Sequence, residues 1–325
     1  MADVAIGQLA ASVWEAKIGG KPTDNIFNSR ALFYTLNKGG FKESSDGGRL
    51  IEFSLMYAEN TNFHSYGEFD ELDTTRVDVF DAARHDWKIA AGTVIYSELE
   101  RLRAAAGNRK FDVIAEKLQN GKDSHIDDLN EQMWSDGTGN GSQDIGGLQH
   151  LIPTTPTTGS VGGINNATWT FYRSRQTSGA QTSSDFDNVR STWTSVYNQC
   201  SLGGLKKKPT SVITTRTVFE GYEGTLVQNV RYGKEDRHKD GDAAFLNEAL
   251  KFKGADVFYD EAAPSGNAYF VNGENLKVVY LKGGWMKMYP EVDPANQLAN
   301  VHKVATFCNM GSNARRHLGV VSSIT

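Results

Sequence analysis

The chain has 325 residues, of which 34 are Lys or Arg and 39 are Asp or Glu, so its formal net charge is −5. This length can bury the core of one large domain or of two smaller ones. The mild acidity argues against a dedicated nucleic-acid-binding protein, because such proteins usually gather basic residues on one face. Hydrophobic residues make up only 39% of the chain and 33 residues are glycine, which fits long extended parts that find apolar partners outside the subunit.

The two cysteines, Cys200 and Cys308, are too few for a disulfide framework or a zinc site. Their apolar neighbours predict buried free thiols instead. The first residues lack the basic start and the apolar run of a signal peptide. The longest stretch without Asp, Glu, Lys or Arg, residues 145–172, contains prolines and paired glycines and is too polar to span lipid. We therefore expect a protein made in the cytoplasm, without a membrane partner.

The first 40 residues are predicted to form an arm. Residues 4–17 are amphipathic, and Gly19, Gly20 and Pro22 end that segment. The stretch that follows, up to residue 37, is a tether with scattered apolar anchors. These anchors are too few to build a core, and they are Ile26, Phe27, Leu32, Phe33 and Leu36.

A long β-hairpin is predicted to follow the arm. Apolar side chains alternate in residues 49–58, and a second run with alternating stretches covers residues 75–96. An isolated two-stranded ribbon is marginally stable in water, so we expect this one to lie on a neighbouring subunit. Its acidic tip could face solvent or bind a cation, and the hairpin geometry favours a third option, pairing with basic residues of the neighbour. The tip residues are Glu68, Asp70, Glu71 and Asp73.

Helical patterns dominate the next segment, residues 97–134. Ser97 is a predicted N-cap, with Glu100 at the capping-box spacing, for a helix that ends before the glycine at position 107. The next helix covers residues 108–134 and shows two apolar stripes. It would be about 39 Å long if continuous, with Gly121 as the expected bend.

The second half of the chain predicts shorter elements. Residues 135–163 are rich in glycine and threonine, and we place a domain boundary there. Beyond it we expect helices from residue 184 and at residues 218–230, and a hairpin turn at Asn272-Gly273-Glu274-Asn275. The predicted class is α+β, without an internal repeat. The predicted strands are residues 211–214, 250–259, 268–271, 276–281, 285–289, 301–309 and 317–322.

No segment has the pattern of a catalytic, cofactor or metal site. The glycine cluster at residues 137–141 follows a helix instead of a strand, so we interpret it as a structural turn and not as a nucleotide-binding loop. Asp236, Asp240 and Asp242 lack the ligand order of an EF-hand loop, and the seven histidines lack metal-ligand spacing. Residues 206–208 are three lysines in a solvated loop, with DNA phosphates as the minor alternative.

Taken together, the sequence resembles the major capsid proteins of tailed bacteriophages that share the Hong Kong 97-type fold. The resemblance covers nearly the whole chain and rests on the order and spacing of short motifs. These motifs are Asp86-Trp87-Lys88, the helix at 108–134, Ser-Asp-Gly-Thr-Gly-Asn-Gly at 135–141, Ile-Gly-Gly-Leu at 145–148, the Pro-Thr-Thr run, Val-Gly-Gly-Ile at 161–164 and Arg315-Arg316-His317-Leu318-Gly319.

The resemblance implies a structural subunit and not an enzyme. Such a subunit forms pentamers and hexamers of an icosahedral shell around double-stranded DNA, belongs to the virion and is made in the bacterial host's cytoplasm. The implied parts are an N-terminal arm at 1–40, an extended loop at 41–75, a peripheral domain at 76–164 with its spine helix at 108–134, an axial domain at 165–290, and C-terminal strands at 291–325 that complete the peripheral domain.

The implied partners are further copies of the chain, a scaffolding protein, a portal, a possible decoration protein and, non-specifically, packaged DNA. No long helical leader precedes the arm, so a separate scaffolding protein is expected. Some shells of this fold are cross-linked through a loop lysine, but residues 49–76 contain no lysine, and we expect non-covalent contacts. The basic partners of the acidic tip are expected among Arg109, Lys110, Arg315 and Arg316.

Other functions stay open at this point. An encapsulin-like bacterial compartment has the same fold, and its cargo groove cannot be identified from one sequence. A tail-tube or other virion component is a second alternative, and an enzyme with an unrecognised site is a third. Purified protein that elutes as megadalton particles would separate a shell protein from an enzyme.

Overall fold

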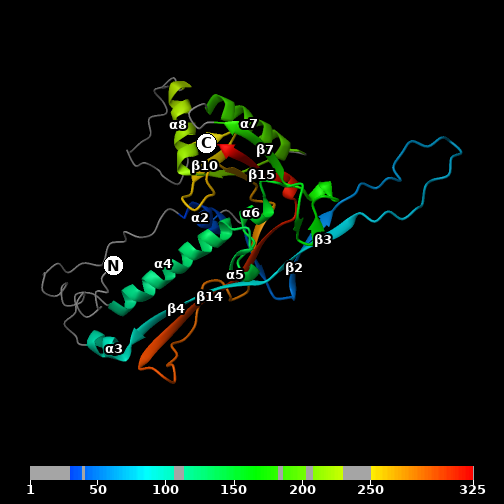
Figure 1. The fold of residues 1–325 in the computed structure, drawn as a ribbon. Coiled ribbons are helices and arrows are strands. Elements are labelled where there is room, and N and C mark those ends of the chain that lie inside the picture. The colour runs from blue at the N-terminus through cyan, green and yellow to red at the C-terminus, as the bar shows by residue number, and fades with distance from the viewer. Residues whose placement is uncertain are drawn as a thin grey trace.

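The computed structural model describes residues 30–38, 41–105, 113–181, 186–202, 208–229 and 250–324. Helices and strands form two lobes, each built around its own sheet (Figure 1), which confirms the α+β class. One lobe holds a five-stranded sheet and the longest helix, and the other holds a six-stranded sheet. The predicted segment 4–17 and the break at residues 107–108 lie outside the described residues.

The five-stranded sheet is organised around its longest strand, β14 (Ala299–Ser312). β4 pairs antiparallel with the first ten residues of β14, and β12 pairs antiparallel with the last five. β1 adds to β12 in parallel, and β13 pairs with the middle of β14. The bounds of these strands are β1 Lys42–Ser45, β4 Lys88–Ser97, β12 Leu276–Leu281 and β13 Lys287–Met288.

The predicted spine helix is α4 (Val113–Trp134), with 22 described residues and a length of about 33 Å. It packs against β4 and β14. Gly121 lies inside this single helix, and a Cβ atom there would collide with the Val94 side chain of β4. The glycine therefore allows a close approach of helix and sheet, a role that the sequence did not indicate.

The capping box that the sequence predicted at residue 97 is present. The Glu100 amide donates to Ser97 Oγ over 3.1 Å, and the Ser97 amide donates to Glu100 Oε2 over 3.2 Å. These two bonds satisfy donors that a helix leaves open at its start, and they begin α3 (Glu98–Ala105) directly after β4. Lys117 of α4 forms an ion pair of 2.8 Å with Glu100, which ties the two helices together.

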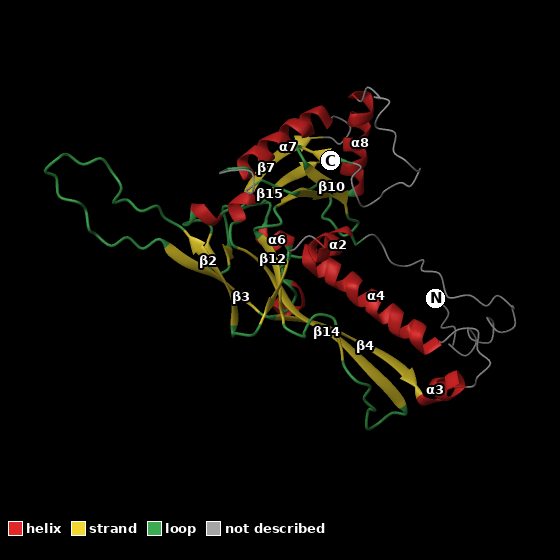
Figure 2. Ribbon diagram, turned by 180° about the vertical axis from the view of Figure 1, so that it is seen from behind, coloured by secondary structure: helices red, strands yellow, loops and turns green. Residues whose placement is uncertain are grey.

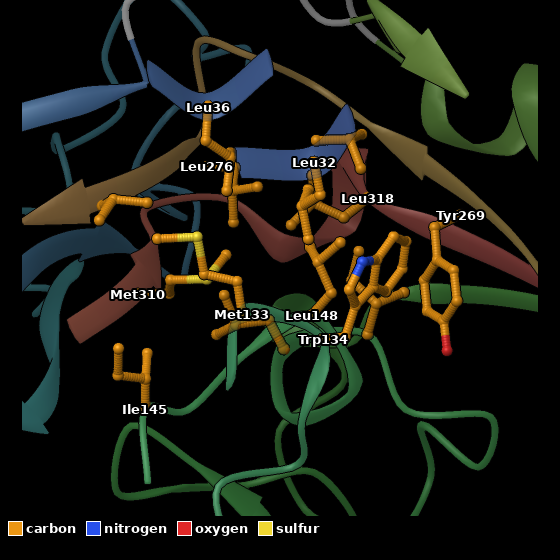
Figure 3. Packing of buried hydrophobic residues seen from close by; sticks show 14 of the residues in the cluster. Leu32, Leu36, Met133, Trp134, Ile145, Leu148, Tyr269, Leu276, Met310 and Leu318 are labelled. Atoms are coloured by element: carbon orange, nitrogen blue, oxygen red, sulfur yellow. The ribbon is translucent and has the colours of Figure 1, made fainter. Parts of the chain in front are cut away.

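The predicted anchors Leu32, Phe33 and Leu36 are buried in the main core, but the last part of the predicted tether is helical. Residues 31–38 form a helix, α2 (Ala31–Lys38), whose Leu32 and Leu36 belong to the main core, with Leu36 next to Leu276 and Leu32 next to Leu318 (Figure 3). The buried carboxylate of Asp260 accepts the Leu32 amide over 2.9 Å at the start of this helix. The run of apolar residues is too short to predict a helix from the sequence. In the fold, packing against the core and the buried Asp260 cap stabilise this helix.

The six-stranded sheet has the order β7-β15-β11-β8-β10-β9 and is covered by helices α7 and α8 (Figure 2). The helix predicted from residue 184 is present as α7, and its Val189, Trp193 and Val196 are fully buried. Trp193 contacts the rings of Phe252 and Phe270 edge-on. The bounds are β7 Arg175–Gln181, α7 Phe186–Cys200, β8 Ser211–Thr214, α8 Arg216–Asn229, β9 Lys251–Phe252, β10 Ala255–Tyr259, β11 Ala268–Val271 and β15 Gly319–Ile324.

Two pairings differ from the sequence predictions. The turn at residues 272–275 exists, with the Leu276 amide donating to the Asn272 carbonyl, but β11 and β12 on its two sides belong to different sheets. The predicted hairpin there is wrong. The predicted strand at 250–259 is instead a tight hairpin of β9 and β10, because Lys253 and Gly254 both take positive φ.

The linear domain boundaries also need correction. Strand β12 was placed in the axial part at 165–290, yet it pairs with β14 in the sheet of the spine-helix lobe. Strand β15 was placed among the C-terminal strands at 291–325 that complete the peripheral part, yet it pairs with β7 and β11 in the six-stranded sheet. Of the strands β14 and β15 in residues 291–325, only β14 belongs to the spine-helix lobe, where both were expected. The chain therefore crosses between the lobes after residue 271 and again after residue 312.

The glycine-rich segment after α4 is a structural turn, as predicted. Gly137 and Gly141 take positive φ, and Asp136 Oδ1 accepts the Thr138 amide over 3.0 Å and its hydroxyl over 2.7 Å. These two bonds lower the pKa of the Asp136 carboxyl. Short elements follow, and they are α5 Gly139–Ser142, α6 Leu148–Leu151, β5 Ser160–Val161, β6 Ile164–Asn165 and the 3₁₀ turn Thr170–Tyr172.

Candidate assembly surfaces

The extended hairpin is formed by β2 (Leu50–Met56) and β3 (Phe80–Asp86), which pair antiparallel over their whole length. We call these paired strands the root of the hairpin. The second strand lies beyond residue 75, the expected boundary of the extended loop, so the hairpin continues to Asp86. The predicted run 75–96 is divided at Trp87, because β3 pairs with β2 whereas β4 enters the five-stranded sheet.

Residues 57–79 form the tip of the hairpin, a loop that projects away from both lobes in both views (Figures 1 and 2). The Tyr57 amide donates to the Val79 carbonyl over 3.0 Å and closes the base of this loop. Asn62 Nδ2 reaches the Thr75 carbonyl across it over 2.6 Å. The backbone bonds of the tip are otherwise few, so the loop has little structure of its own to hold its shape.

The four acidic residues of the tip are all exposed, and two of them also organise the loop. Asp70 Oδ2 accepts the Gly67 amide over 2.5 Å, and Asp73 Oδ1 accepts the Thr75 amide over 2.9 Å. The bonds to Thr75 lower the pKa of the Asp73 carboxyl, so this group stays charged in mild acid. The other two, Glu68 and Glu71, carry the rest of the negative charge to the end of the hairpin.

The hairpin also exposes large apolar side chains, which the sequence analysis missed by attending to charge. Phe63 is 85% exposed and Phe69 is 92% exposed, and both lie in the tip. Exposed apolar groups that gather on one projecting element are typical of an interaction surface. The signal was available in the sequence as aromatic residues inside a polar loop. The other exposed members are Met56, Leu72 and Phe80.

The basic residues proposed as partners of the tip fall into three groups. Arg109 and Lys110 lie outside the described residues. Arg316 is exposed and can meet a neighbour. Arg315 is fully buried in its own subunit, where Nε donates to the Leu151 carbonyl over 2.7 Å and Nη1 donates to Asn166 Oδ1 over 2.9 Å. The expectation that Arg315 contacts another subunit is therefore wrong, because its guanidinium serves its own fold.

A cluster of basic side chains lies where the hairpin root meets the body. The rings of His85 in β3 and His150 in α6 lie 6.3 Å apart, and the charge of Arg315 acts on both. Burial, with repulsion from His150 and Arg315, lowers the pKa of His85 to about 4. Burial also lowers the pKa of His150 and that of Arg315, the latter to about 10. At neutral pH the cluster therefore keeps both imidazoles uncharged.

A second exposed apolar surface lies on the outer face of the spine-helix lobe. β4 turns Ile89 and Ile95 to solvent, while Ala90 and Tyr96 face inward. Leu99 and Leu102 of α3 are exposed as well, as is Leu298 next to the paired end of β14. The lobe thus presents several exposed apolar side chains on and beside a strand that is paired along its whole length.

The described residues contain no group of three or more His, Cys, Asp or Glu side chains placed to hold a metal ion. Asp236, Asp240 and Asp242 lie outside them, as do the lysines at 206 and 207. Among the described helices, none is long and apolar enough to cross a membrane.

Comparisons with known proteins give structural matches alone, since no family model and no curated protein matches the sequence. The chain is similar to the capsid asymmetric unit of cyanophage A-1(L), with a TM-score of 0.68 at 14% identity over 94% of this chain and 95% of that one. It is similar to the capsid of a native GTA particle, with a TM-score of 0.60 at 12% identity over 94% of each chain.

The SrpI encapsulin of Synechococcus elongatus is also similar, with a TM-score of 0.56 at 9% identity over 96% of this chain and 95% of that one. At identities this low, structural similarity shows a shared fold and not a shared function. The matches cover nearly the whole chain and therefore include most of both lobes. The chain has the Hong Kong 97-type capsid fold, as the sequence resemblance predicted.

Proposed function

We propose that this chain is the major capsid protein of a tailed bacteriophage, a subunit that assembles into pentamers and hexamers of an icosahedral shell around double-stranded DNA. The proposal places it in the virion after synthesis in the cytoplasm of a bacterial host. The proposed partners are a separate scaffolding protein, a portal, a possible decoration protein and, non-specifically, packaged DNA. The subunit itself catalyses no covalent reaction.

The exposed tip of the hairpin is the observation that carries this proposal. Phe63 and Phe69 are almost fully exposed on a loop that projects away from both lobes. A subunit that stayed alone in solution would keep this apolar surface in water, which is unfavourable. The same residues become stabilising when a neighbouring copy covers them, and one heterologous contact repeated by rotation closes a ring.

The lobes take the roles that the fold suggests. The lobe of α4, β4 and β14 is the peripheral domain, and the lobe of the six-stranded sheet is the axial domain around the five- and six-fold axes. The hairpin takes the role of the extended loop. The acidic tip pairs with Arg316, Arg109 or Lys110 of a neighbour, and Arg315 is withdrawn from that set because it is buried.

An encapsulin-like compartment is the second candidate, and the similarity to the SrpI encapsulin favours it. The two functions differ in what the shell encloses, which is packaged DNA for a phage and a protein cargo for an encapsulin. The phage function is preferred, because the hairpin and the glycine-rich turn at residues 135–141 resemble the sequences of the phage group more closely.

The test is to purify the full chain, expressed alone and with the neighbouring genes of its source, and to image the megadalton fraction. Closed shells of pentamers and hexamers, filled with DNA when a portal and packaging enzymes are present, are the expected result. Shells that contain one co-purified protein and never DNA would establish the encapsulin function. A chain that stays monomeric under all these conditions would contradict both.

A further inference from the structure

The root of the hairpin is seated on the body through two glycines. A Cβ atom at Gly311 of β14 would collide with the Phe53 ring of β2. A Cβ atom at Gly162, in the turn between β5 and β6, would lie 2.9 Å from the Ala83 Cβ atom and 3.2 Å from His85 Nε2 of β3. The root therefore lies directly against the body at two places where a larger residue would push it away.

Apart from this seat and its own apolar side chains, the root has few attachments to the body. β2 and β3 form a two-stranded sheet that shares no strand with the two larger sheets. Within the described residues, one backbone hydrogen bond joins the root to the body, from the Arg84 amide to the Gly162 carbonyl over 2.9 Å. The root can therefore leave its seat without breaking either of the larger sheets.

The end of the ribbon next to the body has the features of a pivot. Gly47 and Gly48 precede β2 with φ of +142° and +113°, which glycine adopts without strain. Trp87, which follows β3, donates from Nε1 to the Gly48 carbonyl over 2.9 Å and keeps the two ends of the ribbon together. Asn309 Nδ2 of β14 donates to the Asp86 carbonyl over 2.6 Å, so this end stays fixed to the body.

His85 is the titratable group of the seat. Its side chain is only 6% exposed, and Nε2 has no hydrogen-bond partner in the described part of the chain. The charges that act on it come from His150 of α6, from Arg315 of a 3₁₀ turn and from Asp86 of its own strand, and of these only Asp86 is acidic. A proton on His85 in the closed seat would therefore be a buried cation beside the buried guanidinium of Arg315.

Protonation of His85 and opening of the seat are linked for this reason. In the closed seat Nε2 has neither water nor an acceptor, whereas in the open root water surrounds the imidazole and stabilises its charged form. Opening also exposes Ile51 and Leu55, so the open root is a minor state at neutral pH. Acid lowers the cost of opening and raises the population of this state.

We propose that the hairpin root is an acid-operated hinge. A proton on His85 lifts β2 and β3 off their two glycines. The hairpin then turns about Gly47 and Gly48, and the tip points in a new direction while both lobes stay folded. The hinge goes beyond the proposed shell function and belongs to the single subunit, so its test does not depend on assembly.

The test is hydrogen exchange of the full-length, unassembled protein at pH 7.5 and pH 5.0, read by mass spectrometry and corrected for the intrinsic exchange rate at each pH. A pKa of about 4 in the closed seat against 6.5 in the open root predicts a roughly thirtyfold rise in the opening of β2 and β3. Peptides of β8 and β11 should change less than about twofold. An equal rise in these peptides would mean global unfolding and would overturn the proposal, as would the absence of a rise in the root.

His85→Gln removes the proton site and keeps a neutral side chain, so the root should lose most of its response to acid. His125→Gln is the matched control. His125 of α4 is also buried, but its Nε2 lies 2.8 Å from Thr306 Oγ1 in the spine-helix lobe. The hairpin of this variant should respond to acid as the wild type does. A full response that persists in His85→Gln contradicts the hinge.

Two glycines of one turn test the seat itself at neutral pH. Gly162 and Gly163 both take positive φ, so alanine is strained at either position, but a Cβ atom at Gly163 has no neighbour within 4 Å. Gly162→Ala should therefore raise the opening of β2 and β3 at pH 7.5 about tenfold more than Gly163→Ala does, because only the first crowds the root. Equal effects of the two substitutions would show that Gly162 does not seat the root, and the proposal would fail.

Discussion

At its root the extended hairpin buries Ile51 and Leu55 of β2 inside the body, whereas at its tip Phe63 and Phe69 are left in water. The two ends contain similar apolar residues and lie on one continuous ribbon. The root has pairing strands and a core cluster to pack on, and the tip has neither. The difference separates residues that serve the fold of one subunit from residues that await a second one.

Removal of the tip is the strongest way to break this comparison. A variant in which residues 60–74 are replaced by Asn-Gly keeps Tyr57 and Val79, which close the loop base. We expect shell formation to be lost, because the apolar anchors for the neighbour are gone, while the subunit stays folded. Particle yield by electron microscopy and the melting temperature of the unassembled pool check this. Normal shells from the variant would show that the tip is not an assembly element.

Charge reversal at the tip sharpens the same comparison. Changing Glu68, Asp70, Glu71 and Asp73 to lysine together should block assembly, since the loss is repeated at every subunit of a symmetric shell. A single change should be tolerated, because exposed ion pairs contribute only about 0–1 kcal/mol. Particle yield and circular dichroism of the unassembled pool are the measurements. An unfolded pool would mean that the tip supports its own subunit instead.

A matched pair of leucines compares root and tip directly. Leu55→Ala should lower the free energy of unfolding by about 2–5 kcal/mol, because it leaves a cavity in the main core where Leu55 is 3% exposed. Leu72→Ala at the tip should change it by about 0.5 kcal/mol or less and should lower only the yield of shells. Denaturant unfolding of unassembled protein measures both. Equal losses of stability would remove the distinction between the two ends.

As the pH falls, we expect the protein to lose stability at the hairpin root before the charge of the tip changes. His85 has a pKa of about 4 in the fold against 6.5 normally, so the unfolded chain binds more protons between these values. Stability is full above pH 6.5 and falls as the pH drops from 6.5 to 4, by about 3 kcal/mol for this group. His85→Gln should flatten the pH dependence in that window. The exposed His64→Gln should keep the wild-type slope, and an equally steep slope in both variants would exclude His85 as the cause.

The last prediction concerns covalent links between subunits, of which we expect none. Residues 49–76 contain no lysine, and Lys42 in β1 lies away from the tip with its Nζ 3.8 Å from the centre of the Trp285 ring. Denaturing electrophoresis of mature particles should therefore give one monomer band. A ladder of multimers would show a cross-link that starts from another residue.

Local features were predictable from the sequence, and long-range pairings were not. The alternation in β2 and the Ser97–Glu100 capping box depend on neighbours a few residues away, and both are present. The turn after residue 271 was also recognised, but its chemistry does not decide which sheet the next strand joins. That choice depends on β1 and β14, which are far away in the sequence.

The candidate site shows the same limit. The acidic tip was found because charges in a polar loop are visible in any sequence. The burial of Arg315 was not, since its acceptors are the Leu151 carbonyl and Asn166, which lie more than 140 residues earlier. Aromatic residues inside a polar loop were the sequence signal for Phe63 and Phe69, but aromatic residues are usually buried, and the structure was needed to show that nothing in the subunit covers them.

The two free cysteines lie in different buried clusters, Cys308 in the main core and Cys200 in the core between the six-stranded sheet and its helices. Burial raises the pKa of both thiols to about 12, so neither reacts while its cluster is closed. Pulsed alkylation followed by mass spectrometry of the two peptides therefore reports the opening of each cluster separately. The alkylation rates of Cys200 and Cys308 would therefore show which of the two clusters opens first when a particle changes shape.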